Sequence, residues 1–267
     1  MKTAVLMATL TGTGWDRFMP DILGQSMPAD TIVVVVDRPT DAAERGALQA
    51  NWPSVRFVFN GRNRGITASL NIGLANTDAD IVFRADDDDC SAPTRFEEQL
   101  ACFAETGADF VGTWGEGVAD GNEARRYLIR CPTDDAGIRA ALPGRNVLLH
   151  PSLAFRRTSV LALGGYDETF VNAQDYALYL AGMRAGCRFA AVPVPLVRRY
   201  YHSDNVSVKR RANQLMYSCA ARVTHHAATG DRVAFLRTLS HYAMLAATPM
   251  WARVARRRVF KYIGRGA

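Results

Sequence analysis

Four consecutive aspartates are the residues of this chain whose type and spacing point most directly to chemistry. Asp86 to Asp89 follow the apolar run Ile81–Phe83 and Arg84. Neighbouring carboxylates that lose hydration beside a buried strand repel one another, so a positive charge must offset them. Carboxylate oxygens in this number favour Mg²⁺ or Mn²⁺, with water and substrate phosphate filling the remaining coordination positions. The segment therefore predicts a divalent-metal site.

Strand geometry would divide these aspartates into two pairs. If it continues past Arg84, Asp86 and Asp88 point to one side and Asp87 and Asp89 to the other. We expect the first pair to face a ligand and the second to cap the following helix. In a purely structural interpretation the segment is an acidic, solvated turn, in which Asp89 or the serine two residues later is the helix cap. An EF-hand calcium site is not indicated, because the glycine and the distal glutamate of that loop are missing.

Polar residues also stand where two helices are expected to begin. The Asn63-Arg64-Gly65 turn precedes one of them. Because helix N-termini attract anions, this turn is able to approach a phosphate, although ordinary chain reversal uses the same residues. Asp175 begins the other helix, where a carboxylate commonly serves as a cap or as a first-turn charge.

Strands and helices alternate along the first half of the chain and must position these residues. Apolar runs predict strands, and helical spacing predicts two helices. The strands are expected at Thr3–Leu10, Thr31–Val36, Val55–Phe59 and Ile81–Phe83, and the helices at Trp15–Gln25 and Ile66–Ala75. This alternation indicates a doubly wound α/β sheet. Ligands bind at the carboxyl edge of such a sheet, where Asp37 and the four aspartates fall.

The second half of the chain is expected to contain further strands and helices. In chain order we expect a helix at Pro93–Thr106, strands at Phe110–Trp114 and Ser152–Phe155, and a helix at Asp175–Arg184. From Asn213 onward the sequence is helical in character and rich in alanine, with a break at Pro249 before a final basic helix. The chain thus divides into an α/β domain over residues 1–207 and a helical, basic C-terminal extension over residues 208–267.

Composition limits the classes of protein to consider. A chain of 267 residues with 48% hydrophobic content suits one large core, or one core with a small appended unit. Its net charge of +6 comes mostly from arginine, concentrated at Arg198–Arg211 and Arg253–Arg265, which suits phosphate-bearing partners. The five cysteines form no C-x-x-C pair, so neither a disulfide framework nor a zinc site is indicated. Without a signal-peptide cleavage site or an apolar run of roughly 18 to 20 residues, we expect a cytoplasmic protein.

Taken in order, these motifs resemble those of the family 2 glycosyltransferases, which are inverting, nucleotide-sugar-dependent enzymes with the GT-A fold. The resemblance covers Thr3 to Ser207. Its motifs are the strand ending at Asp37, Asn63-Arg64-Gly65, Arg84 to Asp89, His150-Pro151-Ser152, Gly164-Gly165-Tyr166-Asp167, Gln174-Asp175-Tyr176, and Arg198 to His202. The resemblance implies a Rossmann-like, mostly parallel central sheet with flanking helices, followed by the C-terminal helical extension.

The resemblance also assigns a role to individual residues. It implies Asp175 as the catalytic base, Asp88 and His202 as metal ligands, and His150 and Gln174 as acceptor-binding residues. For donor binding it implies Asp37 on the nucleotide base, Asp86 near the ribose and diphosphate, Arg199 on the diphosphate, and also Thr9, Asn63 and Arg64. Two departures from the family pattern affect these roles. Gln174 stands where many relatives have glutamate, and Arg38-Pro39-Thr40 replaces the usual glycine-serine pair.

The implied reaction is a metal-dependent hexosyl transfer. An acceptor hydroxyl loses its proton to Asp175 as it attacks the anomeric carbon, and a nucleoside diphosphate leaves with its charge neutralised. One carboxylate and one Mg²⁺ or Mn²⁺ ion suffice for inversion, without a protein nucleophile. The expected donor is a UDP-sugar. The expected acceptor is a glycan or a lipid-linked sugar in surface polysaccharide or glycolipid synthesis.

The C-terminal segment Met250–Ile263 has the composition of an interfacial amphipathic helix. Trp251, Ala255 and Val259 share one face of the expected helix, while most arginines lie elsewhere. The segment is expected either to rest on an anionic inner membrane face or to pack on the catalytic domain with its arginines solvated.

Three other functions are compatible with parts of the sequence. A sugar nucleotidyltransferase is suggested by Gly12-Thr13 with Arg17 and Pro20, and it would release pyrophosphate in place of a nucleoside diphosphate. A noncatalytic glycan-binding or scaffold protein could share the fold, although the intact Asp86, Asp88 and Asp175 argue against it. Nucleic-acid binding by the basic segments would be nonspecific, because no module that reads a base sequence is present.

Overall fold

Dense apolar runs in the first 84 residues form a parallel half-sheet. The structure, a computed structural model, describes residues 1–10, 15–119, 121–201 and 211–247. In it, β1 (Thr3–Thr9) lies parallel between β2 (Thr31–Val36) and β4 (Ile81–Arg84), and β3 (Val55–Phe59) is parallel to β2. β1, β2 and β4 are buried almost throughout, as β-branched and apolar strands covered by helices on both faces should be.

The second half of the chain completes a mixed sheet. The order of strands within the described residues is β3-β2-β1-β4-β8-β6-β9-β5, with β7 paired to β6. The added strands are β5 (Asp89–Ser91), β6 (Phe110–Ala119), β7 (Arg126–Ile129), β8 (Ala154–Arg156) and β9 (Phe189–Tyr201). β9 runs parallel to β6, and the short β5 pairs antiparallel with the end of β9. This pairing places the end of the acidic segment beside β9, the strand that carries Arg199.

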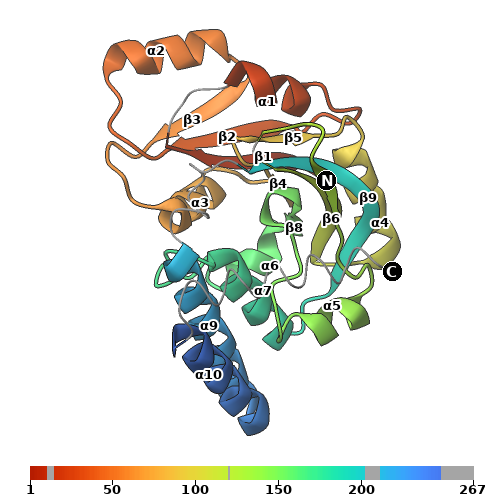
Figure 1. Cartoon of the computed structure of the whole chain (residues 1–267). Coiled ribbons are helices and arrows are strands. Elements are labelled where there is room, and N and C mark those ends of the chain that lie inside the picture. The colour runs from red at the N-terminus through yellow and green to blue at the C-terminus, as the bar shows by residue number, and fades with distance from the viewer. Residues whose placement is uncertain (11–14, 120, 202–210, 248–267) are drawn as a thin grey trace.

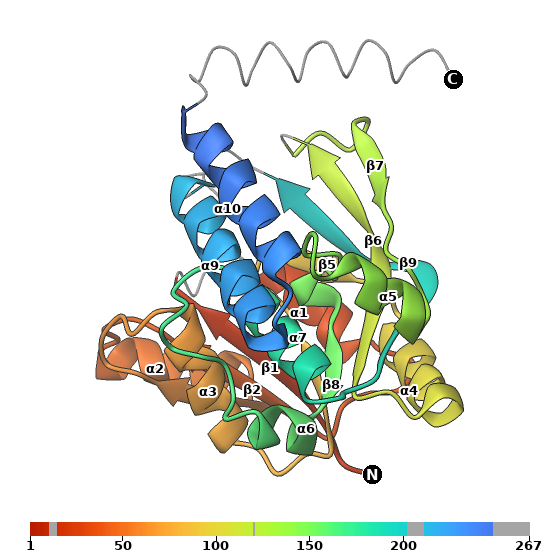
Figure 2. The ribbon, with the colours of Figure 1, turned by 90° about the horizontal axis from the view of Figure 1, so that it is seen from below.

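Helices cover both faces of the curved sheet (Figures 1 and 2). One core contains side chains of α3 (Ile66–Ala75), α5 (Asp135–Ala141), α6 (Arg157–Ala162), α7 (Gln174–Arg184) and α9 (Arg211–Thr229). The other contains side chains of α1 (Trp15–Leu23), α2 (Ala42–Asn51) and α4 (Arg95–Thr106). The layers are therefore helix, sheet and helix, as the alternating pattern of the first half predicts.

The main strand that sequence reasoning missed is β9. Pro193 and Pro195 interrupt its apolar run, and proline usually argues against a strand inside a sheet. Here both prolines are exposed, and the pairing of β6 with β9 shifts register between Thr113 and Gly115. The irregularity lets the strand continue past the prolines to Tyr201. The predicted strand Phe110–Trp114 is likewise longer, because β6 follows β9 as far as Ala119.

C-terminal helices are present, as predicted, and they pack on the α/β core. Ala221 of α9 is buried in the same core as α7, and the Tyr217 ring contacts that of Phe170. α10 (Arg232–Ala247) packs on α9. None of the helices in the described ranges is long and apolar enough to cross a membrane. The predicted domain boundary at 207/208, His202 and the basic segment Met250–Ile263 lie outside the described residues.

Candidate functional site

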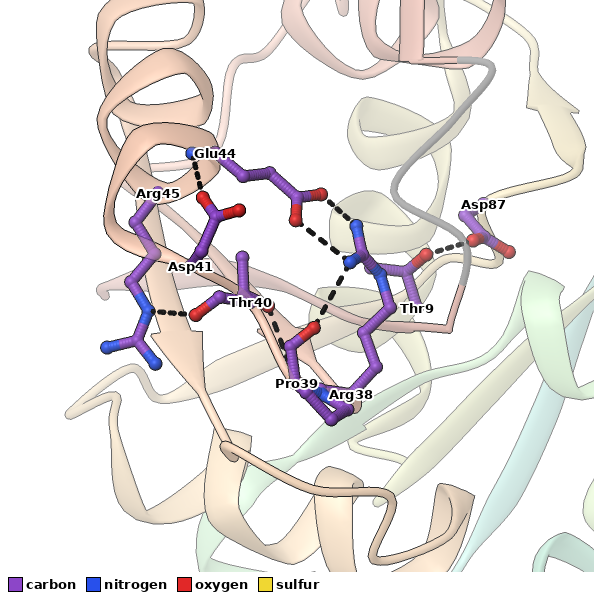
Figure 3. A network of polar contacts seen from close by, with 8 residues as sticks. All are labelled: Thr9, Arg38, Pro39, Thr40, Asp41, Glu44, Arg45 and Asp87. Carbon is purple, nitrogen blue, oxygen red and sulfur yellow. Dashed lines mark hydrogen bonds and ion pairs between the residues drawn. The ribbon is translucent and has the colours of Figure 1, made fainter.

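The carboxyl ends of β1, β2 and β4 meet at one edge of the sheet. The Asp37 amide donates to the Thr9 carbonyl oxygen (2.8 Å), which fixes the end of β2 against the end of β1. The Thr9 hydroxyl donates to the Asp87 carboxylate, which ties the acidic segment to the same edge (Figure 3). Residues that lie far apart in the sequence are thus brought together where parallel sheets bind ligands.

Asp37 organises the turn that precedes α3. Its buried carboxylate accepts hydrogen bonds from the Asn60 side chain (2.8 Å) and from the Arg64 and Gly65 amides (2.7 and 2.8 Å). Asn63 also accepts from the Gly65 amide (3.0 Å), and Gly65 has a φ of 89°, a conformation that glycine adopts readily. In this conformation Asp37 positions the 63–65 turn, and its contact with a nucleotide base stays a prediction.

The segment Arg38-Pro39-Thr40, which departs from the family pattern, is held in place by its own network of polar contacts (Figure 3). The Arg38 guanidinium forms an ion pair with Glu44, with Nη1 2.9 Å from Oε2, and also donates to the Pro39 carbonyl oxygen (3.2 Å). Asp41 caps α2 by accepting from the Glu44 amide (2.8 Å). The loop therefore fixes the start of α2 relative to the end of β2.

The acidic segment does not divide as strand alternation predicts. Strand β4 ends at Arg84, and the chain turns at residues 87–88 before β5 begins at Asp89. Carboxylate oxygens of Asp86, Asp88 and Asp89 all lie within 4.8 Å of one another, whereas Asp87 faces Thr9. The expectation that Asp87 and Asp89 form the second, capping pair is therefore wrong. The turn at 87–88 breaks the two-residue period on which it rested.

The structural interpretation of this segment is correct for the turn at residues 87–88, where Asp88 is exposed, but wrong for the helix cap. The helix after it has Thr94 as its N-cap, with no side-chain cap hydrogen bond. Ser91 instead accepts a hydrogen bond from Arg95 Nη1 (3.0 Å), and Asp89 stands opposite Arg199 in the pairing of β5 with β9. The aspartates are therefore not used as helix caps.

The acidic cluster, Asp86, Asp88 and Asp89, is set up to receive a cation. Both oxygens of Asp89 are buried without a hydrogen-bond partner, and burial followed by the charge of Asp86 raises its pKa well above the usual range. Burial and the charges of Asp86 and Asp87 raise the pKa of Asp88 to about 6. A buried carboxylate without donors is costly unless a positive charge reaches it, and an oxygen-only ligand set suits Mg²⁺ or Mn²⁺. The residues present therefore fit a divalent metal, with Asp88 and Asp89 as candidate ligands.

Two arginines flank the acidic cluster. Arg84, which is buried, forms an ion pair with Asp86. Burial raises the pKa of Asp86, but the charges of Arg84, His150 and Arg199 outweigh it and lower the pKa overall. Burial lowers the pKa of Arg199, but the negative charges around it, that of Asp89 most of all, raise this pKa overall. Arg199 thus lies opposite Asp89 and within electrostatic reach of all three carboxylates of the acidic cluster.

A second wall of the site contains His150 and Asp175. The His150 Nε2 atom lies 3.0 Å from the Tyr166 hydroxyl, and the imidazole is buried. Burial and the charge of Arg84 lower the pKa of His150 to about 4, against the opposing charges of Asp175 and Asp86. His150 is therefore neutral near pH 7, and it lies within electrostatic reach of both carboxylates.

Asp175 is held at the second position of α7. Its Oδ2 atom accepts a hydrogen bond from the Asn146 side chain (2.8 Å). Ala173, just before the helix, has a φ of 55°, and it is the one non-glycine residue with positive φ in the described part of the chain. A left-handed alanine is unfavourable, and such residues gather at functional sites. Gln174 is the first residue of this helix and is half-buried.

Sequence reasoning missed several residues of the site. The sequence motifs assign no role to Arg84, Tyr166 or Asn146, and strand alternation predicts the wrong side for Asp89. Arg84 could have been noticed, since a buried arginine beside four aspartates is their nearest counter-charge. No local signal marks Asn146, whose partner lies 29 residues away. His202 lies outside the described residues, so its predicted metal contact is not part of this geometry.

The family model "Glycosyl transferase family 2" matches residues 17–164 of the chain. The amylovoran biosynthesis glycosyltransferase AmsE of Erwinia amylovora is 28% identical over 194 residues, which is 72% of each chain. An uncharacterized glycosyltransferase of Haemophilus influenzae is 31% identical over 199 residues, again 72% of each. An Escherichia coli protein named UDP-Gal:alpha-D-GlcNAc-diphosphoundecaprenol beta-1,3-galactosyltransferase is 29% identical over 207 residues, 72% of this chain and 70% of that one.

Solved structures resemble the chain in fold. Residues 1–349 of S. aureus TarS, in a crystal structure with UDP-GlcNAc, match with a TM-score of 0.67 and 14% identity. This match covers 84% of this chain and 66% of that one. A second match, to another crystal structure of S. aureus TarS, has a TM-score of 0.62 and 16% identity, and it covers 85% of this chain and 44% of that one. The predicted GT-A fold is confirmed by this likeness together with the strand order.

The raised pKa of Asp88 predicts that metal affinity depends on pH. A proton and a metal compete for the same carboxylate, so the affinity for Mn²⁺ rises as the pH passes upward through about 6. Between pH 5 and pH 7 we expect an increase of about tenfold or more, measured from the electron paramagnetic resonance signal of free Mn²⁺. Asp88→Asn should bind weakly and without this rise. A wild-type affinity that is flat over the range would contradict the assignment of Asp88.

Proposed function

The chain belongs to glycosyl transferase family 2, and we propose that it is an inverting, metal-dependent glycosyltransferase that transfers a sugar from a UDP-sugar to an acceptor hydroxyl. One observation carries this proposal. Three carboxylates, Asp86, Asp88 and Asp89, converge at the carboxyl edge of the sheet beside Arg199, and His150 lies within electrostatic reach of both Asp86 and Asp175. Family membership indicates the general reaction, and the site contains residues that would bind the donor and residues that would activate the acceptor.

The donor half would bind a nucleoside diphosphate. Asp88 and Asp89 would hold Mg²⁺ or Mn²⁺, which when bound neutralises diphosphate charge. Arg199 would add a second positive charge on the diphosphate, and Asp86 would face the ribose. The open start of α3, whose N-cap Gly65 carries no side-chain cap, would present backbone amides to an anion. A relative named for UDP-Gal and a neighbour solved with UDP-GlcNAc support uridine as the base.

The acceptor half would centre on Asp175. In the proposed step the acceptor hydroxyl gives its proton to Asp175 while its oxygen attacks the anomeric carbon. The bond from that carbon to the diphosphate oxygen breaks, and the nucleoside diphosphate leaves with the electron pair. Attack and departure occur on opposite sides of the carbon, so the configuration inverts. Asn146 would orient the carboxylate, and the neutral His150, fixed by Tyr166, would line the acceptor pocket with Gln174.

A lipid-linked or growing surface glycan is the acceptor we propose. The names of two relatives support this acceptor: one relative is named for amylovoran biosynthesis, and the other for transfer to a sugar linked to diphosphoundecaprenol. A sugar nucleotidyltransferase is disfavoured by the family match. A noncatalytic scaffold is disfavoured because Asp86, Asp88 and Asp89 converge, and because the charges of both Asp86 and Asp175 act on His150.

The reaction class is tested by incubating the protein with Mn²⁺, a panel of UDP-sugars and glycan acceptors, and following the products by NMR. The proposal expects UDP as the released product and the opposite anomeric configuration in the new linkage. Release of pyrophosphate would point to nucleotidyl transfer. Retention of configuration would exclude the single displacement proposed for Asp175.

The role of Asp175 is tested by Asp175→Asn. Because the amide cannot take a proton, we expect kcat to fall by about 10²- to 10⁴-fold, with UDP affinity unchanged within about threefold. Asp167→Asn is the matched control, since Asp167 is used locally to hold the Thr169 amide and hydroxyl. It should leave kcat within about twofold. Equal losses in the two variants, or full activity in Asp175→Asn, would remove Asp175 as the base.

A further inference from the structure

One row of paired residues runs across four strands on the face of the sheet that carries the acidic cluster. Asp89 of β5 stands opposite Arg199 of β9. Arg199 stands opposite Gly117 of β6, which in turn stands opposite Tyr127 of β7. Residues that are directly paired across neighbouring strands point to the same face of a sheet. Tyr127 therefore shares a face with the acidic cluster and lies two strands beyond Arg199 (Figure 2).

The ring of Tyr127 lies flat on Gly117. A Cβ atom added to this glycine would lie 2.7 Å from each Cε atom of the ring and closer still to Cζ. These distances place the added atom directly above Cζ, on the face of the ring and not at its edge. Because glycine has no side chain, the ring can cover the strand closely. Tyr127 is nevertheless 48% exposed, so the opposite face of its ring is open to solvent.

Tyr201 and Arg199 extend this aromatic surface toward the acidic cluster. The ring centres of Tyr127 and Tyr201 are 6.1 Å apart, with 26° between the ring planes. The Arg199 guanidinium lies 5.1 Å from the centre of the Tyr201 ring. Burial, together with Tyr201, raises the pKa of Tyr127 to about 12 against the opposing charge of Arg199. Tyr127 is therefore neutral near pH 7, and the two rings form an aromatic surface, the tyrosine platform, beside a cation.

The tyrosine platform adjoins the wall that contains His150. Gly115 lies two residues before Gly117 and on the same face of β6. A Cβ atom added to Gly115 would lie 2.7 Å from Leu149 Cδ2, so the residue before His150 covers this glycine as Tyr127 covers the next one. The platform therefore continues the predicted acceptor side of the site along one face of β6.

The chemistry of the tyrosine platform favours a sugar ring over a nucleotide base. One face of a pyranose carries C–H groups, which pack on the negative face of an aromatic ring, while its hydroxyls stay free to form hydrogen bonds at the rim. The predicted base contact, Asp37, follows β2, and β1, β4 and β8 separate that strand from β6. A base bound at Asp37 would therefore leave the platform free.

We propose that the tyrosine platform is a binding subsite for a sugar ring of the acceptor glycan. The sugar would stack on the open face of Tyr127, with Arg199 between it and the acidic cluster. The nature of the ligand as an acceptor rests on the proposed function. Stacking itself needs neither the donor nor a metal, so the two proposals can be tested separately.

The test is titration of the full chain, without donor or metal, with disaccharides of glucose, galactose and N-acetylglucosamine, followed by saturation-transfer difference NMR. Tyr127→Ala should weaken the binding of the best disaccharide by about tenfold or more, because stacking and buried apolar area are lost together. Tyr127→Phe keeps the ring and should bind within about threefold of the wild type. Gly117→Ala should weaken binding severalfold, because its Cβ displaces the Tyr127 ring.

The matched control is Leu128→Ala, at the next residue of β7. Leu128 is 41% exposed and stands opposite Glu116, so its side chain points to the other face of the sheet. This variant should bind the disaccharide like the wild type. Thermal unfolding of the same samples separates a lost contact from a lost fold, since Tyr127→Ala is expected to weaken binding in a chain that still unfolds cooperatively.

Three outcomes would overturn the proposal. The first is equal binding by the wild type and Tyr127→Ala, or no binding of any disaccharide by the wild type. The second is a loss in Tyr127→Ala confined to UDP-GlcNAc with Mn²⁺, which would assign the platform to the donor. The third is self-association in sedimentation velocity that Tyr127→Ala abolishes, without disaccharide binding, which would make the platform a contact between copies.

Failure of the proposed function would look different. A chain that releases no UDP from any donor, yet binds a disaccharide through Tyr127, would contradict the proposed function and support the subsite. A chain that transfers sugar equally well in the wild type and Tyr127→Ala, with the same KM for the acceptor, would support the proposed function and overturn the subsite.

Discussion

The site depends on the electrostatic cost of holding several carboxylates together at one buried sheet edge. Asp89 is only 7% exposed and lacks hydrogen-bond donors, and Asp86 and Asp88 lie within a few ångströms of it. Such a cluster stays ionised only where positive charge surrounds it. Arg84 supplies part of that charge from the end of β4, and Arg199 supplies more from β9. A divalent cation is the remaining contribution in the proposed function, and the oxygen ligands of the acidic cluster fit one.

This requirement explains why the second half of the chain is folded as it is. The parallel half-sheet alone would leave the acidic segment at an open edge. β9 continues past its two prolines, pairs with the three residues of β5, and so places Arg199 opposite Asp89. The 3₁₀ turn His150–Ser152 then brings His150 within electrostatic reach both of Asp86 and of Asp175, which stands at the start of α7. In the proposed function, one sheet edge would serve the donor, and a wall built from separate segments would serve the acceptor.

Local patterns predict the first half of the fold well, because each strand there is a dense apolar run bounded by polar residues. They fail where the cause is not local. β9 contains prolines that only a register shift in β6 accommodates. The direction in which the Asp89 side chain points depends on where β4 ends. Strand alternation continued past Arg84 therefore predicts the wrong direction. Asp37 was predicted to contact a base, yet its three hydrogen bonds to residues 60–65 could be seen only in the folded chain. Asn146 is a site residue solely through tertiary structure.

Calorimetric titration of UDP, with and without Mn²⁺, into the wild-type chain and Asp88→Ala tests the central claim most directly. GDP, dTDP and CDP serve as comparisons. The acidic cluster as a metal-dependent diphosphate site predicts that UDP binds only when Mn²⁺ is present and that Asp88→Ala loses this binding. UDP binding of equal strength without metal, or in Asp88→Ala, would contradict it, as would the absence of binding by every nucleotide.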